Sequence, residues 1–231
     1  MRKTLFAALL CLVGPFAFEL PAMAQTPPSA SEAAAYTGLL AAAHKGNVAE
    51  IRKLLAAGND ANVRDGWGRT PVQVAAYGSH RDAIRALKAG GADMRAFDRQ
   101  RYDVITISAV KDDATTMRLA IELGGDPKAT TSPYDGTALI AAAHLGHDEV
   151  VRNLLDAGAN VDHINNPGWT ALIEAVILGN GGPRHTECVR AILAAKANPN
   201  IADRQGATPL ALAKTRGYTA MIALIEKAGG K

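Results

Sequence analysis

A short motif recurs along this chain at an almost constant interval, and this repetition restricts the fold more than any other feature. The motif is a threonine anchor followed by a small residue or proline and then an aliphatic residue, as in Thr70-Pro71-Val72, Thr137-Ala138-Leu139, Thr170-Ala171-Leu172 and Thr208-Pro209-Leu210, with Thr37 and Asp103 in phase. The successive steps are 33, 33, 34, 33 and 38 residues. A period of roughly 20–50 residues is typical of a solenoid, in which each repeat stacks on its neighbours.

Two further registers keep this phase. An apolar residue lies fourteen positions after most anchors, and a glycine lies twenty-one positions after them, at Gly58, Gly91, Gly124, Gly158 and Gly229. The long fifth step is due to five residues, Asn180–Arg184, which we expect to form a protruding loop. When they are left out of the count, Lys196 takes the place of the glycine. Its side chain should cost about 1 kcal/mol in the left-handed conformation that ends a helix.

Each unit has the pattern of two helices joined by a turn. The anchor threonine can cap the first helix, and proline is favoured at the position after it. The first helix is interrupted by a glycine at Gly46, Gly146, Gly179 or Gly217. Aromatic residues make up only 5% of the chain, so the core must consist mainly of alanine and aliphatic residues. Such a core suits closely packed helices better than a β-sandwich.

These residues resemble the ankyrin repeat. The match is best from Gly136-Thr137-Ala138-Leu139 through Gly146-His147 to Gly158-Ala159-Asn160, and the resemblance covers about residues 36–230. It implies an all-α ankyrin-repeat solenoid of about six helix-turn-helix units with short β-turn fingers, in a domain spanning residues 36–231. The units are expected at about 36–65, 66–98, 99–130, 131–164, 165–203 and 204–231.

The chain departs from the family pattern in two places. No unit has the histidine that the family usually carries three residues after the anchor; Gln73 stands there in the second unit. The third unit has Asp103 in place of the threonine and lacks the Gly-His pair of the turn. We therefore expect the third unit to be the weakest repeat.

Residues 1–24 have the pattern of a cleavable signal peptide. Arg2 and Lys3 precede an apolar stretch, and Ala22-Met23-Ala24 matches the small-x-small pattern that signal peptidase cleaves. The stretch is too short to span a membrane stably, although an uncleaved anchor is the other interpretation. We therefore expect a periplasmic protein, with secretion as the alternative. Residues 25–35 are expected to form a flexible leader, with the first helix beginning at about residue 33.

Residues that could carry catalysis are few. His144 and His147 could seat two metal ligands, but a zinc site needs three or four, and His147 is the turn histidine of its repeat. Cys188 begins a second helix, where its pKa could be lowered. The corresponding residues Ala83 and Val150 favour a buried packing role instead. We expect no enzyme, cofactor or metal, with a thiol- or metal-dependent enzyme as the less favoured alternative.

The ankyrin resemblance also indicates which surface would bind a partner. Members of the family typically bind proteins with the fingertips before each anchor and with the outer end of the first helix. The partner-binding residues expected on that basis are Trp67, Arg69, Tyr77, Arg99, Tyr102, Lys111, Tyr134, His144, Leu145, Trp169, Ile177 and Leu178. Tryptophan, tyrosine and arginine are enriched at binding hot spots. The opposing interpretation is that Trp67 and Trp169 only brace neighbouring fingers.

These observations favour a non-catalytic scaffold that binds another protein, most simply as a monomer. No cluster of lysine and arginine stands out from the acidic residues around it, so nucleic acid is not an expected partner. No membrane association is expected after signal cleavage. Some exported bacterial ankyrin proteins are associated with catalase and peroxide resistance, so the resemblance suggests an exported redox enzyme as one class of partner. A secreted effector that binds a host protein is the alternative.

Overall fold

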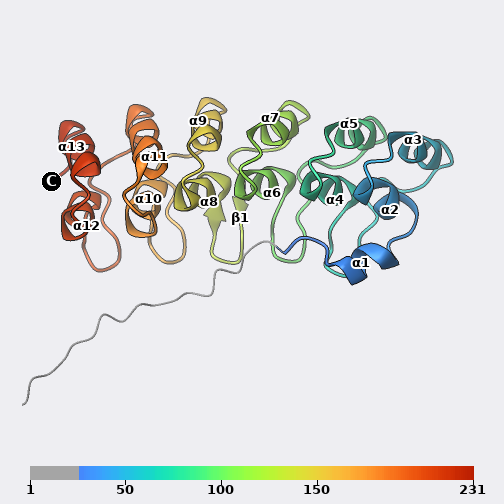
Figure 1. The fold of residues 1–231 in the computed structure, drawn as a ribbon, viewed down its shortest axis with the longest axis horizontal. Coiled ribbons are helices and arrows are strands. Elements are labelled where there is room, and N and C mark those ends of the chain that lie inside the picture. Colours follow the sequence, from blue (N-terminus) through green and yellow to red (C-terminus); the bar gives the residue numbers. More distant parts are fainter. Residues whose placement is uncertain (1–25) are drawn as a thin grey trace, which may run out of the picture.

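The computed structural model describes residues 26–231, so the signal peptide predicted at residues 1–24 lies outside the described part. The helices form two parallel rows along the long axis of the molecule (Figure 1). The row of first helices consists of α2 (Gly38–His44), α4 (Pro71–Tyr77), α6 (Val104–Val110), α8 (Ala138–Leu145), α10 (Ala171–Ile177) and α12 (Pro209–Thr215). The row of second helices consists of α3 (Val48–Ala56), α5 (Arg81–Ala89), α7 (Ala114–Glu122), α9 (Asp148–Asp156), α11 (Pro183–Ala194) and α13 (Thr219–Lys227). The predicted solenoid of helix-turn-helix units is confirmed.

The anchor residues begin the first helices as predicted. The hydroxyls of Thr137 and Thr170 accept hydrogen bonds from main-chain N–H groups three residues on, at 3.2 and 3.3 Å. In the third unit, the carboxylate of Asp103 accepts the equivalent bond from Thr106 at 2.7 Å. Aspartate caps a helix about as well as threonine does. The first helix of the third unit is therefore capped although its anchor is not a threonine.

The core lies between the two rows and is built from small and aliphatic side chains. The apolar residues fourteen positions after the anchors are fully buried in five units: Ile51, Ile84, Met117, Val151 and Val189. Val189 holds this position when the insertion Asn180–Arg184 is left out of the count. Burying one such side chain stabilises a fold by about 1.5–3 kcal/mol. In the last unit Ile222 is only half-buried, as expected of a unit with no neighbour beyond it. None of the helices in residues 26–231 combines the length and apolar character that crossing a membrane requires.

The turn between the two helices of a unit contacts the unit before it. A ring nitrogen or hydroxyl at this turn lies against a main-chain carbonyl of the preceding unit in four cases: His80 on His44 (3.0 Å), His147 on Ala109 (2.8 Å), His185 on His144 (2.9 Å) and Tyr218 on Gly179 (3.0 Å). The third unit has Asp113 at this position, and an ionised carboxylate cannot donate. Lys111 of the same turn donates to the carbonyl of Tyr77 instead. The third unit thereby keeps its bond to the second.

The fingers connect each unit to the next. In one of them β1 (Thr130–Thr131) pairs antiparallel with β2 (Gly136–Thr137). The side chain five residues before the anchor accepts main-chain N–H bonds within the fingertip at Asp65, Asp98, Ser132, Asn165 and Asp203. Neighbouring fingertips also share main-chain hydrogen bonds, from Arg99 to Trp67 (2.9 Å), Ser132 to Arg101 (3.2 Å) and Asn166 to Tyr134 (2.8 Å). The fingers of the second to fifth units are therefore held as one ribbon.

The segment before the first unit differs from the predicted flexible leader. Residues Ala30–Ala35 form the helix α1, which is capped by Ser29. Ser29 accepts a bond from the N–H of Glu32, and the Glu32 carboxylate accepts the N–H of Ser29 at 2.7 Å. This reciprocal pair is a capping box, a local sequence signal that favours a helix. Tyr36 is extended, so α1 ends there and the first repeat begins at α2, later than residue 33.

The insertion Asn180–Arg184 also differs in part from the expected protruding loop. Its last two residues form the first turn of α11, with Pro183 at the favoured first position. The Arg184 guanidinium donates to Asp148 at 3.0 Å and to Asp112 at 2.7 Å. The insertion therefore connects the fifth unit to the turns of the fourth and third.

Lys196 adopts the left-handed backbone conformation that its register predicts, with φ of 64°. We expect Lys196→Gly to raise the free energy of unfolding by about 1 kcal/mol, because glycine adopts this conformation without the steric cost of a Cβ. Urea denaturation followed by circular dichroism would measure the change. Lys196→Ala removes the long side chain but keeps the Cβ, so it should give no gain. An equal gain in both variants would contradict this explanation.

Candidate partner-binding face

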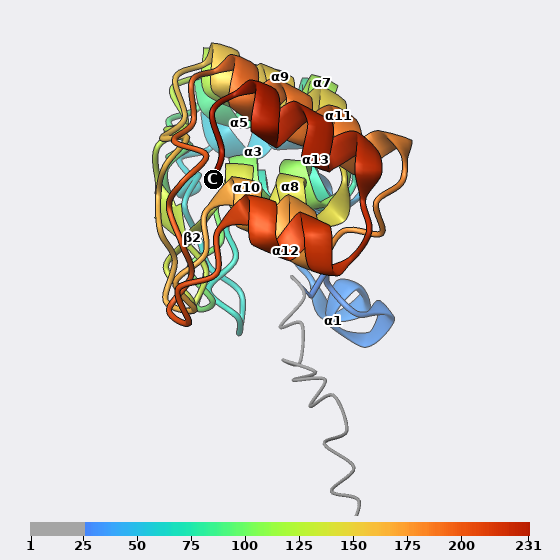
Figure 2. The ribbon, with the colours of Figure 1, turned by 90° about the vertical axis from the view of Figure 1, so that its left-hand side faces the viewer.

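The fingers project past the row of first helices, so that fingertips and first helices enclose one face of the solenoid (Figure 2). We call this the inner face. It is defined by the positions one, three and four residues before each anchor and seven and eight residues after it. Because each unit contributes the same positions, the inner face runs along the array in register with the repeat.

The structure divides the twelve predicted partner-binding residues into three groups. Trp67, Arg99, Lys111, Leu145 and Leu178 are exposed. Tyr77, Tyr134, His144, Trp169 and Ile177 are half-buried. Arg69 and Tyr102 are buried, with exposed fractions of 2% and 6%. The last two are a correction to the sequence prediction, because neither side chain is accessible to a partner in this conformation.

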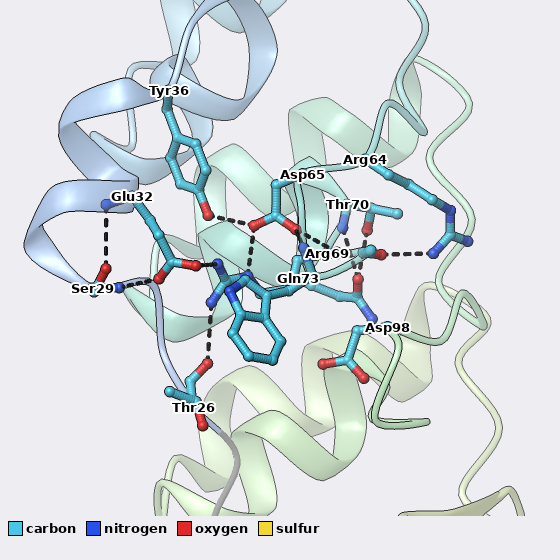
Figure 3. A network of polar contacts seen from close by, with 12 residues as sticks. Thr26, Ser29, Glu32, Tyr36, Arg64, Asp65, Arg69, Thr70, Gln73 and Asp98 are labelled. Atoms are coloured by element: carbon cyan, nitrogen blue, oxygen red, sulfur yellow. Dashed lines mark hydrogen bonds and ion pairs between the residues drawn. The ribbon is translucent and has the colours of Figure 1, made fainter.

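Arg69 is buried because the N-terminal segment covers it (Figure 3). Its guanidinium donates to Asp65 at 2.6 Å, to Glu32 at 3.0 Å and to the carbonyl of Thr26 at 3.1 Å. The hydroxyl of Tyr36 donates to the same Asp65 oxygen at 2.6 Å. Burial alone would raise the pKa of Asp65, but the bonds from Tyr36 and Arg69 outweigh it and hold the pKa below its usual value. The buried arginine is therefore paired with an ionised carboxylate.

Tyr102 is held by its main chain as well as by burial. Asp98 accepts its N–H at 2.9 Å, and its carbonyl accepts a bond from the Gln73 amide at 2.8 Å. Burial raises the pKa of Tyr102, and the charges of Asp98 and Tyr134 add to the shift. The ring therefore lies among the fingers rather than on their surface.

Gln73 takes over the position of the family's histidine. Its side-chain oxygen accepts from the N–H of Thr70 at 2.8 Å and from the hydroxyl at 3.2 Å. Its amide nitrogen donates to the carbonyls of Ala96 at 2.9 Å and Tyr102 at 2.8 Å. All four bonds are buried. Gln73 thus fastens the finger of the third unit to the first helix of the second.

Lys111 and Trp67 each have a second role within the fold. Lys111 forms the bond to Tyr77 described above and also lies 3.3 Å from the hydroxyl of Ser79. The carbonyl of Trp67 accepts the N–H of Arg99, so its main chain braces the next finger. Its indole, however, is 48% exposed. Bracing by the main chain therefore leaves the Trp67 side chain on the surface.

A buried carboxylate lies under the inner face, where the sequence analysis did not predict one. Glu174 on α10 has only 5% of its surface exposed. One oxygen accepts from the amide of Asn165 at 2.9 Å, and His144 lies 3.6 Å from the other. That second oxygen has no hydrogen-bond partner within residues 26–231. Burial raises the pKa of Glu174 to about 7 and lowers that of His144, so both groups are shifted toward their neutral forms.

One sequence signal could have revealed Glu174. The equivalent position, four residues after the anchor, is apolar in the other units: Ala41, Val74, Ile107, Ala141 and Leu212. A carboxylate in an apolar register indicates a buried polar group that needs a partner. Asn165 supplies that partner, since the amide nitrogen that binds Glu174 would be absent if aspartate stood there.

The residues considered for catalysis are placed in packing and structural roles. Cys188 is fully buried, and burial raises the pKa of its thiol to about 12. His147 contacts the carbonyl of Ala109 in the preceding unit. Across the described residues 26–231, no three histidine, cysteine or acidic side chains are grouped so that they could hold a metal ion.

The fold and the inner face define the class of this protein as a helical-repeat solenoid with a lateral surface suited to binding proteins. Two family models for ankyrin repeats match the chain, over residues 39–87 and 105–203. The ankyrin-repeat protein YahD of Escherichia coli is 33% identical over 191 residues, which cover 82% of this chain and 94% of that protein.

Solved structures agree with these matches. An ankyrin-repeat domain from Acinetobacter baumannii is 40% identical, with a TM-score of 0.80 over 84% of this chain and 98% of its own. The ankyrin domain of Bcl-3, at 24% identity and a TM-score of 0.77 over 85% of this chain and 88% of its own, supports the fold alone. The chain belongs to the ankyrin-repeat family. Ankyrin repeats indicate a protein-interaction scaffold, and proteins built from them are generally non-catalytic.

Proposed function

We propose that this protein is a non-catalytic scaffold of the bacterial periplasm that holds a partner protein against its inner face. The observation that carries the proposal is the exposure of large apolar side chains at the inner-face positions. Trp67 is 48% exposed, and Leu145 and Leu178 are each 42% exposed. Leu145 and Leu178 hold the same position in adjacent units, and neighbouring exposed apolar side chains are typical of surfaces that bind proteins. Tryptophan is also among the residue types that contribute most to binding energy.

The inner face combines apolar contacts with positive charge at the fingertips. Arg99 is exposed beside Trp67, and the two residues are linked by the main-chain bond between their fingers. Trp169 and Ile177 are half-buried inner-face residues of the fifth unit, which also carries the exposed Leu178. A partner that buries these side chains would gain hydrophobic contact area along several units at once.

A crosslinking pulldown would test the proposal with two triple variants. Trp67→Ala, Leu145→Ala and Leu178→Ala together should reduce recovery of the partner at least tenfold. The matched control is Val63→Ala, Phe97→Ala and Ile164→Ala. These residues are also exposed and apolar, but they lie six or seven positions before the anchors, outside the inner face. Equal recovery with both folded variants would defeat the proposal.

The periplasmic setting rests on the export pattern of residues 1–24 and has its own test. Cell fractionation combined with N-terminal sequencing should find the mature chain, beginning near residue 25, in the periplasm. Recovery from the culture medium would favour a secreted effector instead. The family resemblance makes an exported redox enzyme the first class of partner to examine among the crosslinked proteins.

A further inference from the structure

The N-terminal segment occupies one end of the inner face. α1 lies beneath the row of first helices, on the side toward which the fingertips project, and does not extend the stack at its end (Figures 1 and 2). We call residues 26–36 the strap. Arg69, which the strap covers, stands one residue before its anchor, at an inner-face position. The strap therefore takes the place that a partner would take at this unit.

Two contacts hold the strap to Arg69, and both are of a kind that another chain can supply. The guanidinium donates to the Glu32 carboxylate at 3.0 Å and to the main-chain carbonyl of Thr26 at 3.1 Å (Figure 3). An extended segment with one acidic side chain offers the same two acceptors. Arginine binds carboxylates strongly because its planar guanidinium presents several donors in a fixed geometry.

Among the helices of residues 26–231, the strap helix α1 is the one that buries no side chain fully. Every residue of α1 is exposed or half-buried, whereas each repeat helix buries at least one side chain. The helix has six residues, well below the roughly 12–15 at which an isolated helix becomes even marginally stable in water. The Glu32 side chain is 29% exposed, while Asp65, the other carboxylate on Arg69, is 5% exposed. The strap can therefore leave while Asp65 stays paired with Arg69.

The charges around the strap favour an acidic replacement. Arg99 is exposed on the finger of the third unit, and its main chain is bonded to Trp67, which borders the strap. The nearest aspartates of these fingers are occupied within the fold, because Asp65 binds Arg69 and Asp98 accepts two main-chain N–H groups. A hollow of about 370 Å³ lies between the strap and the finger, lined in part by Trp67 and Tyr36. The strap thus leaves part of this corner unfilled.

We propose that residues 26–36 are a displaceable strap, and that the partner carries an acidic segment whose carboxylate replaces Glu32 on Arg69. This rests on the proposed function, since it names the chemistry of the partner at one end of the inner face. In the resting chain the strap acts as an internal competitor at a high effective concentration, because it is tethered to the site. The partner binds fully only when the strap has moved aside.

The test uses the full chain and a synthetic probe. The probe is a fluorescein-labelled peptide with the sequence of residues 26–36, compared with the same peptide carrying glutamine at the position of Glu32. By fluorescence anisotropy, Glu32→Gln protein should bind the acidic peptide at least tenfold more tightly than the wild type, because its own strap competes less well. The glutamine peptide should bind both proteins weakly. Glu50→Gln, which changes an acid on α3 outside the inner face, should behave as the wild type.

Hydrogen exchange provides a readout that needs no ligand. Amides of residues 30–36 should exchange faster in Glu32→Gln and in Tyr36→Phe, while amides of α4 and α6 keep their protection. Equal peptide affinity for the wild type and Glu32→Gln, or tight binding of the glutamine peptide, would overturn the strap proposal. If the inner-face triple variant still loses the partner in that case, the scaffold function stands and only the strap is refuted.

Discussion

Replacing Gln73 by alanine should lower the free energy of unfolding by about 3–4 kcal/mol, a large share of the stability of a domain of this size. The variant loses four buried hydrogen bonds at once. It also leaves the carbonyl of Ala96 without its donor, whereas the carbonyl of Tyr102 keeps the N–H of Asp98. A buried polar group without a partner costs about 1–3 kcal/mol, which is more than the net value of the bond it made. Urea denaturation followed by circular dichroism would measure the loss.

Two controls separate the hydrogen bonds from side-chain volume. Gln73→His introduces the residue that the family usually has at this position, and it should recover roughly half of the loss because its ring can bond in two directions. Gln100→Ala changes a fingertip glutamine that is half-buried, so its effect should stay within about 0.5 kcal/mol. If Gln73→Ala costs less than 1 kcal/mol, these bonds are not a major contribution to the joint between the second and third units.

Glu174→Gln should stabilise the protein at alkaline pH by about 2 kcal/mol and have little effect near pH 4.5. The pKa of Glu174 is raised to about 7 in the folded chain, against an ordinary value of 4.5. The native state therefore binds this proton more tightly than the unfolded state, and wild-type stability falls as the pH rises through that window. Glutamine keeps an oxygen for the bond from Asn165 and has no charge to bury.

Urea denaturation at several values between about pH 4.5 and 8 would test this expectation. The difference between Glu174→Gln and the wild type should grow through the window and level off above about pH 7. Glu149→Gln changes an exposed glutamate on α9 and should give a curve parallel to the wild type. If the curve of Glu174→Gln is also parallel to that of the wild type, ionisation of the buried carboxylate does not destabilise the fold.

The features predicted correctly are those that depend on neighbours close in sequence or on the repeat itself. The helix caps, the buried apolar register and the left-handed Lys196 follow from local chemistry repeated with one period. The replacement of histidine by Gln73 was visible in the sequence. The sequence did not show that Gln73 bonds both Thr70 and the next finger. The acceptors in that finger lie 23 and 29 residues away, so the structure was needed to find them.

The candidate site was predicted less completely, for a physical reason. Arg69 and Tyr102 were expected on the partner-binding surface, yet both are buried. The burial of Arg69 depends on contacts that the repeat does not encode. For Arg69 the cover is a segment 37 residues earlier in the chain, outside the repeat. Its capping box at Ser29 and Glu32 was a local signal for a helix, but not for where that helix would lie. Glu174 was detectable only as a departure from an apolar register.

The bonds from each turn to the unit before it give the array a direction of growth. A unit added after α13 would complete this bond with its own histidine or tyrosine, because the carbonyls at the end of α12 are already in place on an exposed surface. A unit added before α2 would instead have to meet the turn between α2 and α3, which makes no bond of this kind in the described structure. For this bond alone, adding a unit requires less change at the C-terminal end than at the N-terminal end.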